Sequence, residues 1–174
     1  MAATVSQGHA GSSGTEPEVA ATIRSFVRSE YPRVVAVVGH ATGDPDAAED
    51  AVQDALLKVL RDGHRPERLG AWVTVVAMNG VRGRQRRSKA ERRATDRMDK
   101  PAPVDPASST ADRVSVLAAV GALPDGQRTA VLLHYYLDSS VADIAAAMGV
   151  SEGTVKTHLH RGRASLATAL GEST

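Results

Sequence analysis

The sequence of 174 residues contains no cysteine. This absence excludes disulfide bonds, cysteine-ligated zinc and catalysis by a thiol. Aromatic residues are also few, with one phenylalanine, one tryptophan and three tyrosines. No apolar run reaches the roughly eighteen residues that a membrane span needs, and the first residues lack the basic and apolar segments of a signal peptide. We therefore expect a cytoplasmic protein without membrane insertion.

Strand-like alternation of apolar and polar residues is missing from the N-terminal half, whereas helical spacing recurs along most of the chain. The pattern predicts an all-α fold class, with two small helical domains joined by a flexible linker. The linker contains PAPVDPASST, which is rich in proline and small polar residues. The predicted boundaries are a disordered tail over 1–16, one helical domain over 17–94, the linker over 95–110 and a second helical domain over 111–172.

Charge is distributed unevenly, although the net charge is only +1. Residues 44–57 contain five acidic side chains and no basic one, whereas residues 82–100 contain nine basic and three acidic side chains. Segregation of this kind predicts two different partners. One surface favours a basic partner, and the other favours a polyanion such as the phosphates of a nucleic acid.

A helix with an acidic exposed face is predicted over residues 45–62. Gly43 ends the preceding helix, Asp44 can cap the new one, and Pro45 suits its first position. Leu57 lies among the acids of the exposed face, which suits a partner's basic and partly apolar surface better than water. The helix would spread the carboxylates around its circumference, so we expect no metal and no cofactor here.

A third long helix is predicted to begin near Leu69 and to become strongly basic towards its C-terminal end. Gly80 and Gly83 each cost a helix about 1 kcal/mol relative to alanine, so this end is expected to fray unless something packs on it. The many bases make phosphate a suitable partner. The ring body of Trp72 is expected to pack in the core.

Residues 141–166 predict a helix-turn-helix. Two helical patterns meet at Gly149, and Ser151 is a suitable N-cap for the second helix. At about 100° per residue, the second helix has one apolar face and one polar face. A recognition helix presents such a polar face to the major groove of DNA. The polar face comprises Thr154, Lys156, Thr157, His160 and Arg161.

No group of residues predicts catalysis, so we do not expect an enzyme. His158 and His160 are two residues apart on a helix, which makes their side chains diverge by about 200° and prevents them from sharing a metal. The acids and histidines elsewhere show no converging constellation.

Three segments, in their order and spacing, resemble the extracytoplasmic-function (ECF) sigma factors of bacterial RNA polymerase. They are GDPDAAEDAVQDALLKVL from Gly43, AWVTVVAMN from Ala71 with arginines after it, and LPDGQRTAVLLHYYLDSSVADIAAAMGVSEGTVKTHLHRGRASL from Leu123. The resemblance covers residues 20–170. It implies two helical domains on a flexible linker, no cofactor, and a sigma factor that binds core RNA polymerase and directs promoter-specific transcription initiation.

The resemblance also implies a role for each surface. The acidic helix would dock on the clamp region of the largest polymerase subunit through Asp50, Gln53, Asp54 and Leu57. The third helix would engage the minus-10 promoter element through Trp72, Asn79, Arg82, Arg84, Arg86 and Arg87. The helix-turn-helix would read the minus-35 element through Thr154, Lys156, Thr157, His160 and Arg161. An anti-sigma factor is a further candidate partner.

The third helix departs from the family pattern. Met78 stands where family members usually have arginine, and Gly80 and Gly83 replace residues that favour a helix. Single-strand capture uses stacking on flat side chains, which are scarce here. Promoter melting is therefore expected either to depend on the 62–70 loop or to be weak.

Two alternatives to the sigma-factor interpretation stay open. The first is a decoy that binds polymerase without melting promoters. The second is a stand-alone dimeric helix-turn-helix transcription regulator, because the output domains of response regulators often share the segment GTVKTHL. The lack of strand-like alternation in the N-terminal half argues against a phosphate-receiver domain and so against this second alternative.

Overall fold

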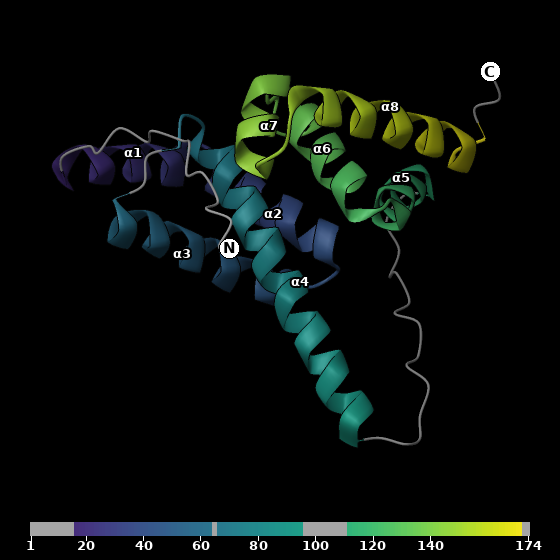
Figure 1. Ribbon diagram of the computed structural model, residues 1–174, viewed down its shortest axis with the longest axis horizontal. Helices are drawn as coiled ribbons and strands as arrows, with labels where there is room; N and C mark the ends of the chain where they lie inside the picture. The colour runs from purple at the N-terminus through teal and green to yellow at the C-terminus, as the bar shows by residue number, and fades with distance from the viewer. Residues whose placement is uncertain (1–15, 64–65, 96–110, 172–174) are drawn as a thin grey trace, which may run out of the picture.

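Residues 16–63, 66–95 and 111–171 are described by a computed structural model, and every regular element in these ranges is an α-helix. The all-α fold class is thereby confirmed. The predicted disordered tail and flexible linker fall almost wholly outside the described residues. The helices are α1 (Glu16–Ser29), α2 (Tyr31–Thr42), α3 (Pro45–Asp62), α4 (Leu69–Thr95), α5 (Ala111–Ala122), α6 (Asp125–Tyr135), α7 (Val141–Met148) and α8 (Glu152–Ala169) (Figure 1).

Local capping sets the boundaries between α2 and α3, because the ends of a helix carry backbone groups without helical partners. Gly43 ends α2 in the left-handed conformation, with φ of 70°, and its N–H donates to the carbonyl of Gly39. The Asp44 side chain accepts a hydrogen bond of 3.0 Å from the backbone N–H of Ala47. The helix then begins at Pro45, so the predicted range 45–62 is confirmed.

Helices α1 to α4 form the N-terminal domain, in which α3 packs against both α2 and α4. The buried side of α3 is an apolar stripe, with Ala51 in addition. Met78 of α4 is wholly buried, so the residue that departs from the family pattern serves here as part of the core. The residues of the α3 stripe are Ala48, Val52, Ala55, Leu56 and Val59.

Helix α4 continues through both glycines to Thr95. Fraying was expected only if nothing packed on this end, and tertiary contacts are present around the glycines, as is common for helices of mediocre propensity. Val81 is fully buried between the glycines. Arg84 donates to the carbonyl of Ala47 at 3.2 Å, and Gln85 donates to the carbonyl of Thr42 at 3.1 Å.

Replacing Gly83 with alanine is expected to stabilise the protein by up to about 1 kcal/mol, which corresponds to a rise in Tm of about 2–4 °C. A Cβ atom at this position would meet nothing within 4 Å, so only the gain in helix propensity is expressed. Thermal denaturation followed by circular dichroism measures the change. Gly162→Ala is the control. Its Cβ would lie 2.8 Å from Cγ2 of Val131, so this substitution should lower Tm. An equal or lower Tm for Gly83→Ala would contradict the expectation.

Helices α5 to α8 form the C-terminal domain, and α7 and α8 make the predicted helix-turn-helix. Ser140 and Asp143 form a capping box at the start of α7. Gly149 turns the chain with φ of 66°, and the Ser151 hydroxyl then caps α8 by accepting from the backbone N–H of Thr154 at 3.2 Å. The buried side of α8 packs against α6 and α7. That side includes Val155, Leu159 and Gly162.

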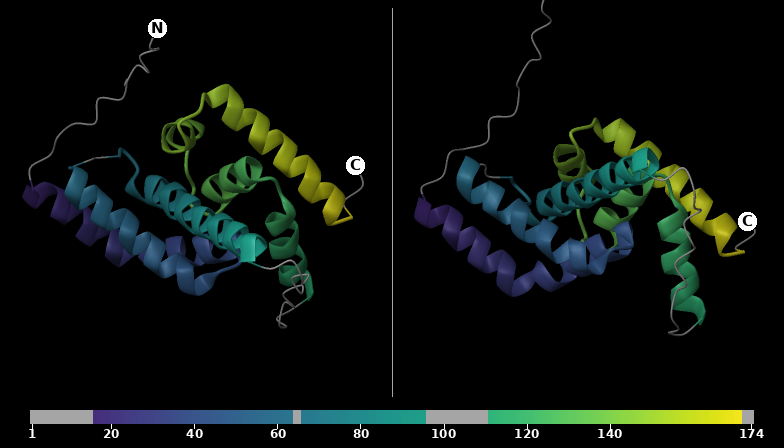
Figure 2. Two further views of the ribbon diagram at one scale, coloured as in Figure 1. Left: turned by 60° about the horizontal axis from the view of Figure 1, so that its bottom comes forward. Right: turned by 90° about the horizontal axis from the view of Figure 1, so that it is seen from below.

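The two domains pack against each other. Helix α4 contacts α6 and α7, and α2 contacts α5 and α6. Figure 2 shows α4 lying between the α2–α3 side and the α6–α7 side of the molecule. The buried apolar side chains of both domains form a single cluster. Because of this packing, α4 contacts both α3 of its own domain and α6 and α7 of the C-terminal domain.

Candidate functional site

The acidic face of α3 comprises Asp50, Gln53, Asp54 and Leu57, which are spaced so that they share one side of the helix. All four are exposed, and Leu57 exposes 54% of its surface. The structure therefore brings the predicted polymerase-binding set together, opposite the buried stripe. Leu57 has Gln53 and Asp54 one turn before it and Arg61 one turn after it, and an exposed apolar side chain beside carboxylates is suited to a partner that is basic and partly apolar.

Two further residues belong to the acidic face and were not predicted from the sequence. Leu60 exposes 49% of its surface and follows Leu57 by three positions, so it extends the apolar part of the face. The Tyr31 hydroxyl of α2 accepts a hydrogen bond of 3.3 Å from Nε2 of Gln53 and donates one of 3.4 Å to Oε1 of Glu49. The spacing of Leu60 could have revealed it, whereas the contact of Tyr31 depends on the packing of α2 on α3.

The basic set on α4 does not share one face. At about 100° per residue, Trp72, Asn79 and Arg86 fall within about 40° of one another, with Arg87 about 100° from Arg86. Trp72 is half-buried, as expected for a ring body in the core, and the other three are exposed. Trp72, Asn79, Arg86 and Arg87 therefore form a candidate nucleic-acid surface.

Arg84 points towards α3. Its guanidinium donates to the carbonyl of Ala47 at 3.2 Å and lies 3.8 Å from Oδ2 of Asp54. Both side chains of the ion pair are largely exposed, so the pair contributes little to stability and is easily exchanged for another partner. Arg84 thus connects the predicted DNA-binding set to the predicted polymerase-binding set.

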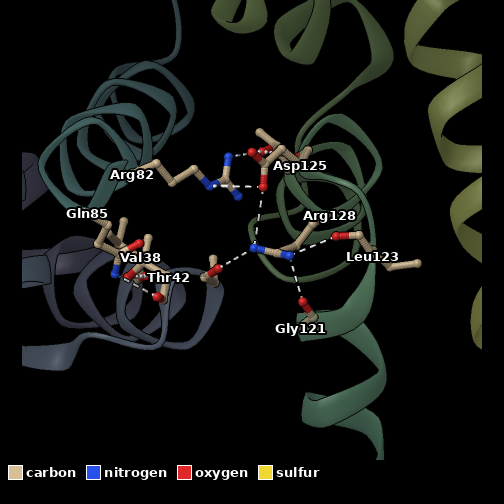
Figure 3. Close-up of polar contacts among 10 residues, drawn as sticks. Val38, Thr42, Arg82, Gln85, Gly121, Leu123, Asp125 and Arg128 are labelled. Atoms are coloured by element: carbon tan, nitrogen blue, oxygen red, sulfur yellow. Dashed lines mark hydrogen bonds and ion pairs between the residues drawn. The ribbon is translucent and has the colours of Figure 1, made fainter. Parts of the chain in front are cut away.

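Arg82 points towards the C-terminal domain and is only 8% exposed. Its Nε lies 3.4 Å from Oδ1 of Asp125, and its Nη1 donates to Oγ1 of Thr129 at 3.4 Å (Figure 3). Burial lowers the pKa of Arg82 from its usual value, and Asp125 opposes that shift. The side chain nevertheless remains charged, as arginine does in proteins. In this arrangement Arg82 is covered by α6, so its contact with DNA stays a prediction.

The polar face of α8 is open to solvent, with Thr154 half-buried at its edge. The threonine hydroxyls are engaged locally: that of Thr157 donates to the carbonyl of Gly153 at 2.9 Å, and that of Thr154 lies 2.9 Å from Oγ of Ser151. Nζ of Lys156 lies 3.7 Å from a carboxylate oxygen of Glu152. Besides these residues, the exposed face carries His160 and Arg161.

Metal-binding groups and membrane spans are both absent from the described ranges. No group of three or more histidine, aspartate or glutamate side chains there could hold a metal ion. None of the described helices is both long enough and apolar enough to cross a membrane.

The chain has an acidic helix and a basic helix in one domain, followed by a helix-turn-helix domain, and its family matches place it in the sigma-70 class of sigma factors. Residues 26–91 match Sigma-70 region 2, and residues 113–166 match Sigma-70, region 4. The chain belongs to the ECF RNA polymerase sigma factors, because it is 34% identical over 156 residues to the ECF RNA polymerase sigma factor SigL of Mycobacterium tuberculosis. That match covers 81% of this chain and 86% of SigL.

Two other proteins support this assignment. The RNA polymerase sigma-E factor of Streptomyces avermitilis is 31% identical over 144 residues, which cover 81% of this chain and 80% of that protein. The solved structure of the sigma factor RpoE in complex with the anti-sigma factor NepR, from Bartonella quintana, has a TM-score of 0.70 and 25% sequence identity. That likeness covers 88% of this chain and 99% of the RpoE chain.

Membership of the family identifies the activity. The chain is a sigma factor that binds core RNA polymerase and directs promoter-specific transcription initiation, so its partners are the polymerase and promoter DNA. The match of residues 26–91 to region 2 also weighs against a stand-alone helix-turn-helix regulator, which would not need such a domain.

Proposed function

We propose that each of the three surfaces has its own role in transcription initiation. The acidic face of α3 docks on the clamp region of the largest polymerase subunit. The exposed side chains of α4 around Trp72, Asn79, Arg86 and Arg87 engage the minus-10 element, and the polar face of α8 reads the minus-35 element. The domain that carries the first two surfaces spans residues 17–94, the domain of α8 spans 111–172, and residues 95–110 link them.

The observation that carries this proposal is the exposure of Leu57 and Leu60 within the acidic face of α3. Leucine side chains of this kind gain free energy when a partner covers them. The surrounding carboxylates select a partner with positive charge. A clamp helix with basic and apolar side chains meets both requirements.

DNA recognition in this proposal combines two kinds of contact. Arginines of α4 bind phosphates and position the duplex, while side chains of α8 contact base edges and specify the sequence. The polymerase holds both domains near the promoter, which raises the effective concentration of the second contact once the first has formed. The free chain is then a weak and salt-sensitive DNA binder.

The proposal assigns no bond-making or bond-breaking step to this chain. It supplies sequence selection to the polymerase, which performs the chemistry, and it acts in the cytoplasm where the polymerase and the promoters are. The anti-sigma factor in the RpoE structure suggests a comparable inhibitor for this chain.

The test combines the full chain with bacterial core polymerase and a panel of promoters. Discrete transcripts from a subset of promoters, absent with core polymerase alone, are expected. Tight DNA binding without polymerase, together with no stimulation of transcription, would favour the stand-alone regulator. Polymerase binding with no transcripts from duplex promoters would favour the decoy.

A further inference from the structure

One edge of the acidic face of α3 meets α2. At about 100° per residue, Glu49 and Gln53 lie about 40° apart, one turn from each other and on the same side of Leu57. Both side chains are exposed, and both make a hydrogen bond with the hydroxyl of Tyr31, the first residue of α2. Tyr31 is therefore the residue through which α2 reaches the predicted polymerase-binding set.

The ring of Tyr31 is held in place by packing. It is half-buried against the hydrophobic core, and it meets the ring of Phe26 edge to face, with 6.4 Å between the centroids and 82° between the planes. Pro32 follows it and restricts the backbone at the start of α2. The Tyr31 hydroxyl thus has a fixed position, whereas the exposed side chains of Glu49 and Gln53 would otherwise keep their rotamer freedom.

The direction of the two hydrogen bonds follows from the protons that are present. A tyrosine hydroxyl has one proton to donate, and an ionised carboxylate can only accept. The Tyr31 proton therefore goes to Oε1 of Glu49, at 3.4 Å. The hydroxyl oxygen is left to accept, so Gln53 must turn its amide nitrogen Nε2 towards Tyr31, at 3.3 Å. The carbonyl oxygen Oε1 of Gln53, on the other arm of the planar amide, is then turned away from Tyr31.

This orientation changes what the acidic face offers to a partner. A freely turning amide presents N–H donors as well as its oxygen, and a donor that faces a lysine or arginine is left unpaired. With Nε2 held by Tyr31, Gln53 presents its oxygen alongside the carboxylates of Asp50 and Asp54. All three polar members of the acidic face then offer acceptors, which match the donors of a basic partner.

We propose that Tyr31 is a positioning residue of the polymerase-binding surface, whose hydroxyl holds the Gln53 amide so that Oε1 meets the partner's basic side chains. The inference rests on the proposed function, because it takes the acidic face of α3 as the surface that docks on polymerase. Exposed hydrogen bonds of this length are weak, since water competes for the same groups. Loss of the hydroxyl is accordingly expected to change Kd several-fold rather than to abolish binding.

Tyr31→Phe removes the hydroxyl and keeps the ring that packs on Phe26. The full chain with this substitution should bind core polymerase about threefold more weakly in fluorescence anisotropy titrations. Gln53→Ala should weaken binding by at least as much, and adding Tyr31→Phe to it should cause no further loss, because Tyr31 acts through Gln53. Tyr135→Phe is the matched control. It removes the hydroxyl of an exposed tyrosine of α6, away from the acidic face, and should leave Kd unchanged.

A second readout needs no polymerase. The chain has four glutamines, so its glutamine side-chain amide signals in the NMR spectrum of nitrogen-labelled protein are few, and those of Gln53 are identified by their loss in Gln53→Ala. Tyr31→Phe should shift the Gln53 signals. The signals of Gln85 should stay in place, since its Nε2 donates to the carbonyl of Thr42 at 3.1 Å. Circular dichroism shows whether each variant is folded.

The outcomes separate a positioning role from a structural one. A shift of the Gln53 signals, together with a rise in Kd that disappears beside Gln53→Ala, supports the proposal. Unchanged Gln53 signals, an unchanged Kd, or a rise in Kd that persists in full beside Gln53→Ala overturns it. The proposed function fails instead if replacing Asp50 and Asp54 with lysine leaves Kd unchanged, so the two failures are distinguishable.

Discussion

Replacing Asp50 and Asp54 together with lysine is expected to weaken binding of the chain to core RNA polymerase by about a hundredfold or more. Both carboxylates are exposed on the acidic face of α3, about 20° and 60° from Leu57 around the helix. The substitutions turn two attractive contacts into repulsive ones against a basic partner, while Leu57 stays in place. Fluorescence anisotropy of labelled chain titrated with core polymerase measures the change in Kd.

The matched control is Asp62→Lys combined with Glu67→Lys. Both residues are exposed, and the pair makes the same change in net charge away from the acidic face. Its Kd should stay within about threefold of the unmodified chain, since rim charges affect affinity weakly. Helical circular dichroism establishes that both double variants are folded. Equal Kd values for the two variants would remove the role proposed for the acidic face.

Features set by local chemistry could be predicted from the sequence. Gly43, Asp44 and Pro45 act within a few residues of one another, so they indicated where α2 ends and α3 begins. Gly149 and Ser151 did the same for the helix-turn-helix. Helical periodicity then placed the exposed faces of α3 and α8 correctly, because each of these helices has one side covered by its neighbours.

Features that depend on contacts between residues far apart in the sequence could not be predicted in this way. The sequence does not distinguish the arginines of α4 from one another. In the structure, Arg84 contacts α3, whereas Arg82 contacts α6. The partner of Arg82 lies more than forty positions along the chain. Charge patterning gives the sign of a surface but not the direction of each side chain.

Helix α4 packs between α3, which carries the acidic face, and the C-terminal domain. Its two sides touch α3 and the C-terminal domain, and its remaining face carries Trp72, Asn79 and Arg86.

Replacing Arg161 with alanine is expected to lower transcription from promoters with a preferred minus-35 element by about tenfold or more. Arg161 is exposed on the polar face of α8, about 120° from the buried Val155. Alanine is too short to reach a base edge from this position, so the variant should discriminate less between base pairs. Run-off transcription from a promoter library with a randomised minus-35 element should show relaxed preference there and unchanged preference at the minus-10 element.

Arg163→Ala is the matched control, because it removes the same charge from the same helix. Arg163 is also exposed but lies about 80° from Val155 on the other side, next to the packed face. Its replacement should weaken transcription slightly and uniformly across the library, as expected for a phosphate contact or none. If Arg161→Ala lowered all promoters equally, Arg161 would be a phosphate contact, and the specificity of α8 would have to come from Lys156, Thr157 and His160.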